Sequence, residues 1–241
     1  MGSRKSRTEI CGGKYKMRPA NVVVITGTST GIGAATAKFF LERNFEVHGL
    51  DIRNDIEIPS KLTYFYHHHR CDISKKDELP QIDNVDILIN NAGVQEGSMR
   101  DIEVNLIGLI NCTEKYGIQP NIKSILNVAS VSAHNGAEYP EYCASKGGML
   151  AYTVNTAKRV AHWGATCNSI SPGGVFTDMN KGVIEDKDKW NKIMDMTPLR
   201  RWATADEIAE WIYFFTVMNQ SCTAQDLIID NGESFNHTFV E

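Results

Sequence analysis

The sequence predicts a doubly wound α/β fold, in which helices cover both faces of a parallel sheet of about seven strands. Short apolar runs that suit buried strands alternate along the chain with longer segments that suit helices. The 241 residues are 42% hydrophobic and 22% charged, a composition that supports one large core. A glycine-rich turn follows the first apolar run and leads into a helix-like segment. These observations predict a single α/β domain over residues 19–241.

The first strand is the clearest element, because residues 21–26 read NVVVIT, a continuous β-branched run that suits a strand buried on both faces. The later strands are shorter apolar runs bounded by polar or glycine residues. They are expected at residues 45–50, 63–68, 85–90, 124–129, around 166–170 and around 226–229. Helices between them are expected at residues 34–43, 100–116, 141–163 and 205–217.

Composition and charge exclude several classes of protein. The net charge is −4, and no block of like charges follows residue 18, so no nucleic-acid partner is expected. The six cysteines form no C-x-x-C pair, which favours reduced thiols in a reducing compartment. No apolar run has the roughly 18–20 residues of a membrane span. We therefore expect a cytoplasmic protein without a membrane partner, whose residues 1–18 are a flexible extension or a cloning remnant.

The glycine-rich turn predicts a dinucleotide site. Gly27, Gly31 and Gly33 have the spacing G-x-x-x-G-x-G, between a buried strand and a helix. Glycines let the backbone turn sharply and approach a pyrophosphate, whose charge meets the free amides at the start of the helix. A purely structural tight turn is the alternative, and the buried strand directly before the turn argues against it.

Asp51 indicates the choice of cofactor. It closes the second strand, about twenty residues past the glycines, where a carboxylate can accept hydrogen bonds from the adenosine ribose. It would repel a 2′-phosphate, so NAD(H) is expected and NADP(H) is less favoured. Arg53 is the opposing signal, since its cation could turn toward a phosphate. A solvated carboxylate at a strand end is the alternative for Asp51.

Tyr142 and Lys146 form a candidate acid/base pair. They are four residues apart on an expected helix, and therefore lie on one face about a turn apart. A free phenol has a pKa of about 10 and is a poor base at neutral pH. A nearby ammonium and the positive ring of an oxidised nicotinamide would lower that pKa. The Y-x-x-x-K pattern is also common on protein surfaces, so it needs support from the other motifs.

The motifs follow one another in the order typical of the short-chain dehydrogenase/reductase family, which the sequence resembles from about residue 20 to its end. The matching segments are TGTSTGIG at 26–33, Asp72, NNAG at 90–93, VNLIG around Asn105, NVAS ending at Ser130, YCASK at 142–146, PGGVFT at 172–177, PLRRWATADEIAEWIYFF and DLIIDNG. The resemblance implies a Rossmann-type fold and an NAD(P)-dependent oxidoreductase.

The resemblance also implies four catalytic roles. Tyr142 would exchange the proton of the substrate hydroxyl, and Ser130 would orient the substrate oxygen. Lys146 would bind the nicotinamide ribose and tune the tyrosine, and Asn105 would distort its helix and hold a water in the proton path. Ser130 lies twelve residues before Tyr142, where thirteen is usual in the family, so Ser132 remains an alternative.

Cofactor contacts are expected from the residues of these motifs. They are Gly27, Thr30, Gly31, Ile32, Gly33, Asp51, Ile52, Asp72, Ile73, Asn91, Ala92, Gly93, Tyr142, Lys146, Pro172, Gly173, Val175 and Thr177. The stretches 51–72, 72–90 and 93–105 are shorter than is usual in the family. We therefore expect abbreviated outer helices and a more open cleft on that half of the sheet.

Several further residues are weaker indications of function. His67, His68 and His69 suggest metal, but side chains alternate along a strand, so at most two converge, and no acidic partner is suitably spaced. No metal is therefore expected. Cys143 beside the tyrosine is expected to be a packing residue. Trp202 and Met179 are weak candidates for the substrate pocket.

The predicted function is reversible hydride transfer between NAD(H) and a secondary alcohol or ketone of the hydroxysteroid, polyol, sugar or 3-hydroxyacyl type. A non-enzymatic NAD-sensing protein on the same scaffold is the first alternative. An epimerase or dehydratase of the extended relatives is the second, although those carry a further substrate domain. The resemblance and the apolar helix that carries Tyr142 favour a homotetramer or homodimer.

Overall fold

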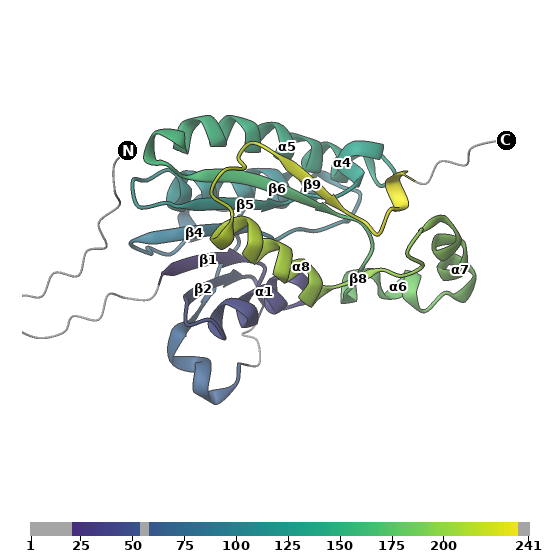
Figure 1. The fold of residues 1–241 in the computed structure, drawn as a ribbon, viewed down its shortest axis with the longest axis horizontal. Coiled ribbons are helices and arrows are strands. Elements are labelled where there is room, and N and C mark those ends of the chain that lie inside the picture. Colours follow the sequence, from purple (N-terminus) through teal and green to yellow (C-terminus); the bar gives the residue numbers. More distant parts are fainter. Residues whose placement is uncertain (1–20, 54–57, 236–241) are drawn as a thin grey trace, which may run out of the picture.

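A computed structural model describes residues 21–53 and 58–235 and confirms the predicted fold class (Figure 1). Seven parallel strands form one sheet in the order β3-β2-β1-β4-β5-β6-β9. The strands are β1 (Val22–Thr26), β2 (Glu46–Asp51), β3 (Tyr66–Arg70), β4 (Val85–Asn90), β5 (Ser124–Val128), β6 (Thr166–Pro172) and β9 (Asp226–Ile229). The extension expected at residues 1–18 lies outside the described residues.

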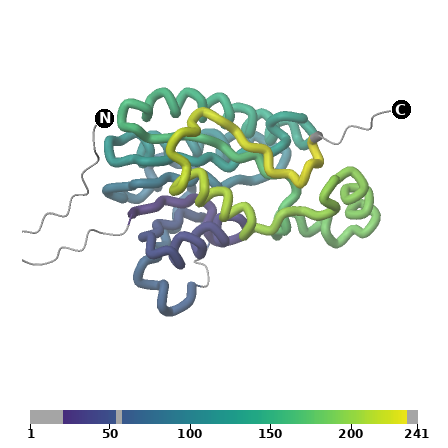
Figure 2. Tube along the Cα trace, viewed as in Figure 1, coloured from purple at the N-terminus to yellow at the C-terminus, as the bar shows by residue number. Residues whose placement is uncertain are grey.

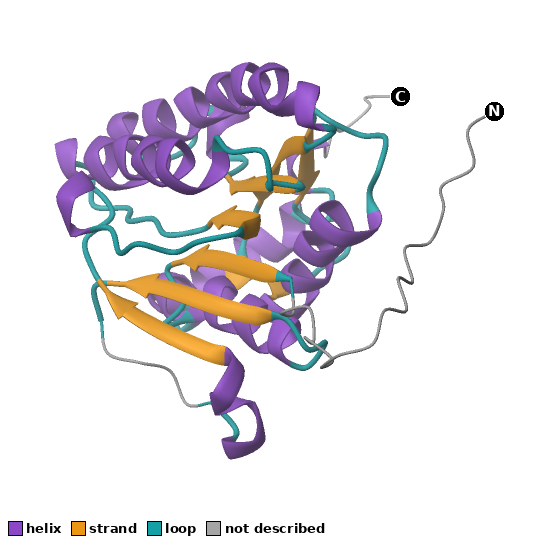
Figure 3. Ribbon diagram, turned by 90° about the vertical axis from the view of Figure 1, so that its left-hand side faces the viewer, coloured by secondary structure: helices purple, strands orange, loops and turns teal. Residues whose placement is uncertain are grey.

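Helices lie on both sides of this sheet (Figure 3). The α-helices are α1 (Gly31–Leu41), α2 (Met99–Asp101), α3 (Leu109–Cys112), α4 (Ser132–Asn135), α5 (Pro140–Val160), α6 (Lys181–Ile184), α7 (Lys187–Met196) and α8 (Ala205–Tyr213). The π-helical segments are η3 (Ile102–Gly108), η4 (Thr113–Gly117) and η7 (Phe214–Met218). The 3-10 helices are η1 (Ser60–Phe65), η2 (Lys76–Glu78), η5 (Ala161–Trp163), η6 (Asp178–Asn180) and η8 (Glu233–Phe235).

Strand β1 is buried along its whole length, as its β-branched sequence predicts. Its alternate side chains enter two different cores. Val23 packs on one face with Phe40 of α1 and Ile208 of α8. Val24 packs on the other face with Tyr116 and other residues beneath η4 and α5. The strand is therefore held between two hydrophobic layers, which fixes the position of the turn that follows it.

The strand order changes direction at β1, whose neighbours are β2 on one side and β4 on the other. In open sheets of this kind, a crevice forms beyond the carboxyl ends of the strands at such a reversal. The topology therefore predicts the binding site at the ends of β1 and β4.

Three local features differ from the sequence expectations. The third strand begins at Tyr66 rather than residue 63, because Ser60–Phe65 form a 3-10 helix. The helix expected over 100–116 is present, but much of it has π-type hydrogen bonding. A small sheet of β7 (Val175–Phe176) and β8 (Ala203–Thr204) and the helices α6 and α7 were not anticipated. The segment with α6 and α7 extends from the body of the fold (Figure 2).

The outer helix is abbreviated in the β3–β4 connection, as expected, whereas a cleft more open than is usual in the family stays a prediction. Between β3 and β4, a stretch fully described in the structure, the only helix is the 3-10 turn Lys76–Glu78. None of the helices in the described parts of the chain is long and apolar enough to cross a membrane.

Substitution of Gly33 tests how closely the glycine turn is packed. A Cβ atom at this position would collide with the carbonyl oxygen of Gly27 and the side-chain amide of Asn91. Gly33→Ala should therefore lower the free energy of unfolding by about 1–3 kcal/mol. Gly147→Ala is the matched control, because a Cβ there meets nothing within 4 Å and should stabilise helix α5 slightly. Thermal unfolding of both variants checks this, and equal midpoints would contradict it.

Candidate active site

A cleft of about 660 Å³ opens at the carboxyl ends of the strands. Its walls include Gly27 after β1, Asp51 at the end of β2, Asn91 after β4 and Pro172 at the end of β6. All the expected cofactor contacts line it except Gly33, which lies behind the turn. Thr28 is buried in that turn, where its hydroxyl lies 3.1 Å from that of Tyr66. The predicted crevice is therefore present and contains the predicted residues.

The glycine turn is closed against the end of β4. Gly27 and Gly31 have positive φ angles of 75° and 56°, which favour glycine. The Asn91 side-chain amide donates to the carbonyl oxygens of Thr26 at 2.9 Å and Gly27 at 3.2 Å. Helix α1 begins at Gly31, and its N-cap residue Thr30 makes no side-chain capping bond. The amides at the helix start are therefore available to an anion, which fits a dinucleotide pyrophosphate.

The Asp51 carboxylate is held in place beside this turn. Its Oδ2 accepts a hydrogen bond from the Ser29 backbone amide at 2.9 Å, and its Oδ1 accepts one from the Arg53 amide at 2.9 Å. A side chain fixed in this way differs from the freely solvated carboxylate of the alternative interpretation. The Arg53 side chain also lines the cleft, so a cation that could turn toward the 2′-phosphate of NADP(H) is present as well.

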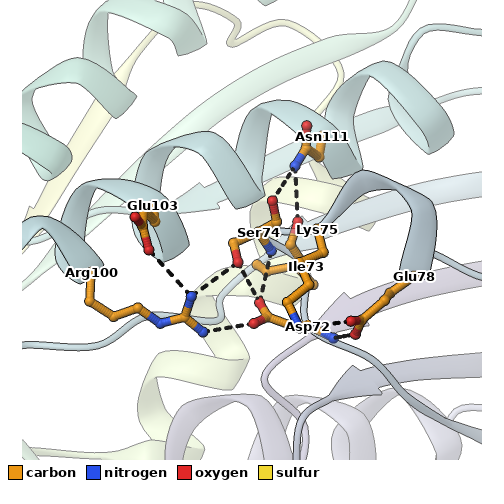
Figure 4. Close-up of polar contacts among 8 residues, drawn as sticks. All are labelled: Asp72, Ile73, Ser74, Lys75, Glu78, Arg100, Glu103 and Asn111. Atoms are coloured by element: carbon orange, nitrogen blue, oxygen red, sulfur yellow. Dashed lines mark hydrogen bonds and ion pairs between the residues drawn. The ribbon is translucent and has the colours of Figure 1, made fainter.

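Asp72 lines the cleft and lies in a polar network (Figure 4). Arg100 Nη2 donates to Asp72 Oδ2 at 2.8 Å, and the Ser74 hydroxyl donates to Asp72 Oδ1 at 2.7 Å. Burial raises the pKa of Asp72, but the hydrogen bonds from Arg100 and Ser74 outweigh it, so the net shift is downward. Sequence reasoning missed Arg100, because 28 residues separate it from Asp72 and no motif marks it.

Tyr142 and Lys146 are both buried on one face of α5, which begins at Pro140. Lys146 Nζ lies 5.6 Å from the centroid of the Tyr142 ring and donates to the Val128 carbonyl oxygen at 2.9 Å. Both side chains line the cleft. The helical spacing therefore produces the proximity that the sequence predicts.

Both candidate serines line the cleft, and Ser130 is the one that contacts Tyr142. It follows β5 at the cleft wall, and its hydrogen bond to Tyr142 lowers the pKa of the phenol. The Ser130 Oγ also lies 3.2 Å from Ser132 Oγ and accepts a hydrogen bond from the Ser132 amide at 3.1 Å. Ser132 therefore contacts Ser130 directly, and the choice between the two serines as the residue that contacts substrate stays a prediction.

Asn105 lies in the π-helical segment η3 and is fully buried. Its side-chain oxygen accepts from the Val94 amide at 2.8 Å, and its amide donates to the Val94 carbonyl at 2.9 Å and to Ser145 at 3.1 Å. It does not line the cleft itself. Asn105 therefore fastens the loop after β4 to helix α5.

Burial shifts the pKa values of Tyr142 and Lys146 in opposite directions. Burial raises the pKa of Tyr142 to about 12, although the hydrogen bond from Ser130 opposes the rise. Burial also lowers the pKa of Lys146 to about 8. Within the chain itself, burial therefore disfavours the charged form of both groups. The expected lowering of the tyrosine pKa includes the positive ring of an oxidised nicotinamide and stays a prediction.

The remaining candidate residues differ in whether they line the cleft. Cys143 lies outside the cleft lining, in agreement with a packing role. Trp202 and Met179 both line the cleft. Trp202 is buried against the rings of Trp190 and Phe176, at centroid distances of 5.1 and 6.2 Å. Its indole nitrogen has no hydrogen-bond partner within the described chain.

Comparisons with known proteins agree with this arrangement. The sequence matches the short chain dehydrogenase family over residues 21–188. It is 29% identical over 236 residues to carbonyl reductase family member 4 of Xenopus tropicalis, covering 88% of this chain and 97% of that protein. It is 31% identical over 243 residues to 3-oxoacyl-(acyl-carrier-protein) reductase FabG of Chlamydia pneumoniae, covering 88% and 96%. The solved structure of 4-hydroxyisoleucine dehydrogenase complexed with NADH is 28% identical, with a TM-score of 0.82 over 89% of this chain and 98% of that one.

Lys146 should destabilise the folded chain at neutral pH. A pKa of about 8 in place of 10.5 corresponds to a cost of about 3 kcal/mol, partly offset by about 1 kcal/mol for its hydrogen bond to Val128. Lys146→Met should therefore raise the unfolding midpoint of the cofactor-free protein at pH 7 by about 4–8 °C.

The pH dependence of this difference provides a control. As pH rises above 8, the folded state loses the lysine proton while the unfolded chain retains it, so the wild type gains stability. The advantage of Lys146→Met should therefore shrink between pH 8 and 10.5. A variant that is less stable than wild type at pH 7 would contradict the assigned burial cost.

Proposed function

The chain belongs to the short chain dehydrogenase family, and we propose that it is an oxidoreductase that exchanges hydride between NAD(H) and a secondary alcohol or ketone. The observation that carries the proposal is the convergence of two sets of residues in one cleft. The Ser130, Tyr142 and Lys146 side chains lie at one part of it, and the glycine turn with Asp51 lies at another. A nicotinamide cofactor that spans the cleft supplies the hydride chemistry when bound.

Tyr142 is the proton donor or acceptor in this proposal, and Ser130 holds the substrate oxygen by a hydrogen bond as charge develops on it. Lys146 binds the nicotinamide ribose and supplies positive charge near the phenol. Asn105 keeps helix α5 and the loop after β4 in register and belongs to the proposed proton path.

The tyrosine pKa supports action in the direction of reduction. A phenol with a pKa of about 12 keeps its proton at neutral pH and can give it to a carbonyl oxygen. Removing that proton at pH 7 would cost roughly 7 kcal/mol without further positive charge. Alcohol oxidation therefore needs Lys146 in its charged form and a cationic ring beside Tyr142. Both curated relatives described above are named as reductases, which agrees with this direction.

NAD(H) is the proposed cofactor, because the fixed Asp51 carboxylate can accept hydrogen bonds from the adenosine ribose and would repel a 2′-phosphate. The 4-hydroxyisoleucine dehydrogenase structure, which contains NADH, supports this choice by similarity. We propose Asp72 and Ile73 as the residues beside the adenine, with Arg100 positioning Asp72.

The substrate side of the cleft includes the buried indole of Trp202 and the exposed Met179. A partly apolar substrate suits this wall, and hydroxysteroids, polyols and 3-hydroxyacyl thioesters are the classes to test. We also propose a homotetramer or homodimer, which would cover apolar side chains now exposed on the helices, including Ile107, Val154, Trp211 and Phe214.

Tyr142→Phe tests the proposed reaction. A screen by absorbance at 340 nm with NAD⁺ and alcohols, and with NADH and carbonyl compounds, of the three classes should first identify a substrate. The variant should then lose 10²–10⁴-fold in kcat, because proton transfer is removed, while NADH affinity changes only a few-fold. Tyr152→Phe, on the same helix but bonded to Glu114, is the matched control. Retention of more than about a tenth of wild-type kcat would contradict the assignment. Cofactor binding without turnover in the whole screen would favour an NAD-sensing protein.

Asp51→Ala tests the choice of cofactor. Wild-type protein should prefer NAD(H) over NADP(H) by at least about tenfold in affinity, and the variant should narrow or invert this preference. Loss of charge-assisted hydrogen bonds costs about 1.5–3 kcal/mol, or roughly ten- to a hundredfold in NAD(H) affinity. Removal of the repulsion should improve NADP(H) binding at the same time.

Calorimetric titration of both cofactors into both proteins measures this, and Asp83→Ala, outside the cleft, is the control. Equal wild-type affinities for the two cofactors, or an unchanged ratio in Asp51→Ala, would refute the assignment.

A further inference from the structure

A cluster of histidines and one glutamate lies on the sheet edge, outside the cleft described above. Strand β3 is the edge strand and pairs in parallel with β2, with His48 opposite His67. Because side chains alternate along strands, Glu46 and His48 of β2 share one face with His67 and His69 of β3. His68 belongs to the opposite face, where its ring nitrogen lies 3.2 Å from the Tyr66 hydroxyl.

Three of these side chains bring donor atoms together at one point. Glu46 Oε1 lies 3.4 Å from His48 Nε2 and 3.2 Å from His67 Nε2. Zinc bonds of about 2.0–2.1 Å in a tetrahedral site place neighbouring donors about 3.3 Å apart. The two measured separations match that spacing. The three donor atoms all lie within 4.8 Å of one another, so all three can approach a single ion.

His69 supports the cluster from behind. The other ring nitrogen of His48, Nδ1, lies 3.0 Å from His69 Nε2, and the two rings are nearly parallel at 9°. A hydrogen bond from His48 Nδ1 to His69 leaves the lone pair of His48 Nε2 directed at the cluster. Metal-bound histidines almost always use their second nitrogen in this way, which fixes the tautomer and the ring orientation.

The short β3–β4 connection leaves this face of the sheet accessible. In that connection the structure places only the 3-10 turn Lys76–Glu78. The exposed fractions of the side chains are 16% for His48, 29% for Glu46 and 42% for His67. A metal ion can therefore reach the cluster, and a water molecule can complete its coordination.

We propose that Glu46, His48 and His67 form a zinc site that links strand β2 to the edge strand β3. Two imidazoles and one carboxylate are ligands that Zn²⁺ prefers, whereas Mg²⁺ and Ca²⁺ prefer oxygen ligands alone. The ion would fasten the outermost strand, which has a neighbour on one side only, to the strand that carries Asp51. The site is independent of the proposed hydride transfer, because none of its three ligands lines the cleft.

Zinc titration of the chelator-treated full chain, prepared without a histidine tag, tests the proposal. We expect saturable binding of one Zn²⁺ per chain and an increase in the unfolding midpoint with Zn²⁺ concentration. Co²⁺ in place of Zn²⁺ should give the intense visible absorption of a tetrahedral site. Loss of a group that supports a metal ligand typically weakens metal affinity 10–100-fold. We therefore expect His69→Gln to bind Zn²⁺ 10–100-fold more weakly than the wild type. Glu46→Gln and His67→Gln should each weaken binding by more.

His68→Gln is the matched control, since it removes a neighbouring imidazole from the opposite face and should leave zinc affinity unchanged. Circular dichroism and the metal-free unfolding midpoint of each variant verify that it folds. An equal loss of zinc affinity in His68→Gln and His67→Gln would overturn the proposed site. Unchanged zinc binding in both Glu46→Gln and His67→Gln would also overturn it. Absence of saturable binding to the wild type would also overturn it.

Discussion

The attachment of the β1 end to the β4 end is the constraint on which the rest of the site depends. The Thr26 hydroxyl accepts from the backbone amides of Asn91 and Ala92, both at 2.9 Å, while the Asn91 side chain donates back to the carbonyl oxygens of Thr26 and Gly27. These reciprocal bonds hold two strands together at the point where the sheet order reverses. They fix the glycine turn, the start of α1 and therefore the floor of the cleft.

A second polar network holds helix α5 against the sheet. Asn90 donates to Asn127 at 2.9 Å, and Asn127 donates to Thr153 on α5 at 2.8 Å, all within the buried interior. Buried polar groups that are paired in this way specify one packing arrangement, because any slip would leave them without partners. Tyr142 and Lys146 are thereby held at fixed, buried positions, where a lysine with a lowered pKa is costly for stability. The packing that holds helix α5 against the sheet therefore fixes the position of Lys146 without stabilising its positive charge.

The abbreviated outer connections have consequences at two places. Without a long β3–β4 helix, Asp72 is held by Arg100 from α2 and by its neighbour Ser74 (Figure 4). The same shortening leaves the histidine face of β2 and β3 accessible. The short connection therefore borders both the part of the cleft lined by Asp72 and the edge of the sheet.

The features that depend on local spacing could be predicted from the amino-acid sequence. The alternation of strands and helices predicted the fold class, and the glycine spacing up to Gly33 predicted the turn. The four-residue separation of Tyr142 and Lys146 predicted that both lie on one helix face. Helical and strand periodicities are fixed by backbone geometry, so they can be read from a single segment.

Tertiary structure decided what depends on distant segments. It placed Ser130 and Ser132 together in the cleft wall, brought Arg100 to Asp72, and buried Tyr142, which raises the pKa of its phenol. It also supplied Glu46 and His48 to His67 from the neighbouring strand, where no acidic partner was expected. Strand register and burial arise from packing of the whole chain, and no spacing within one segment encodes them.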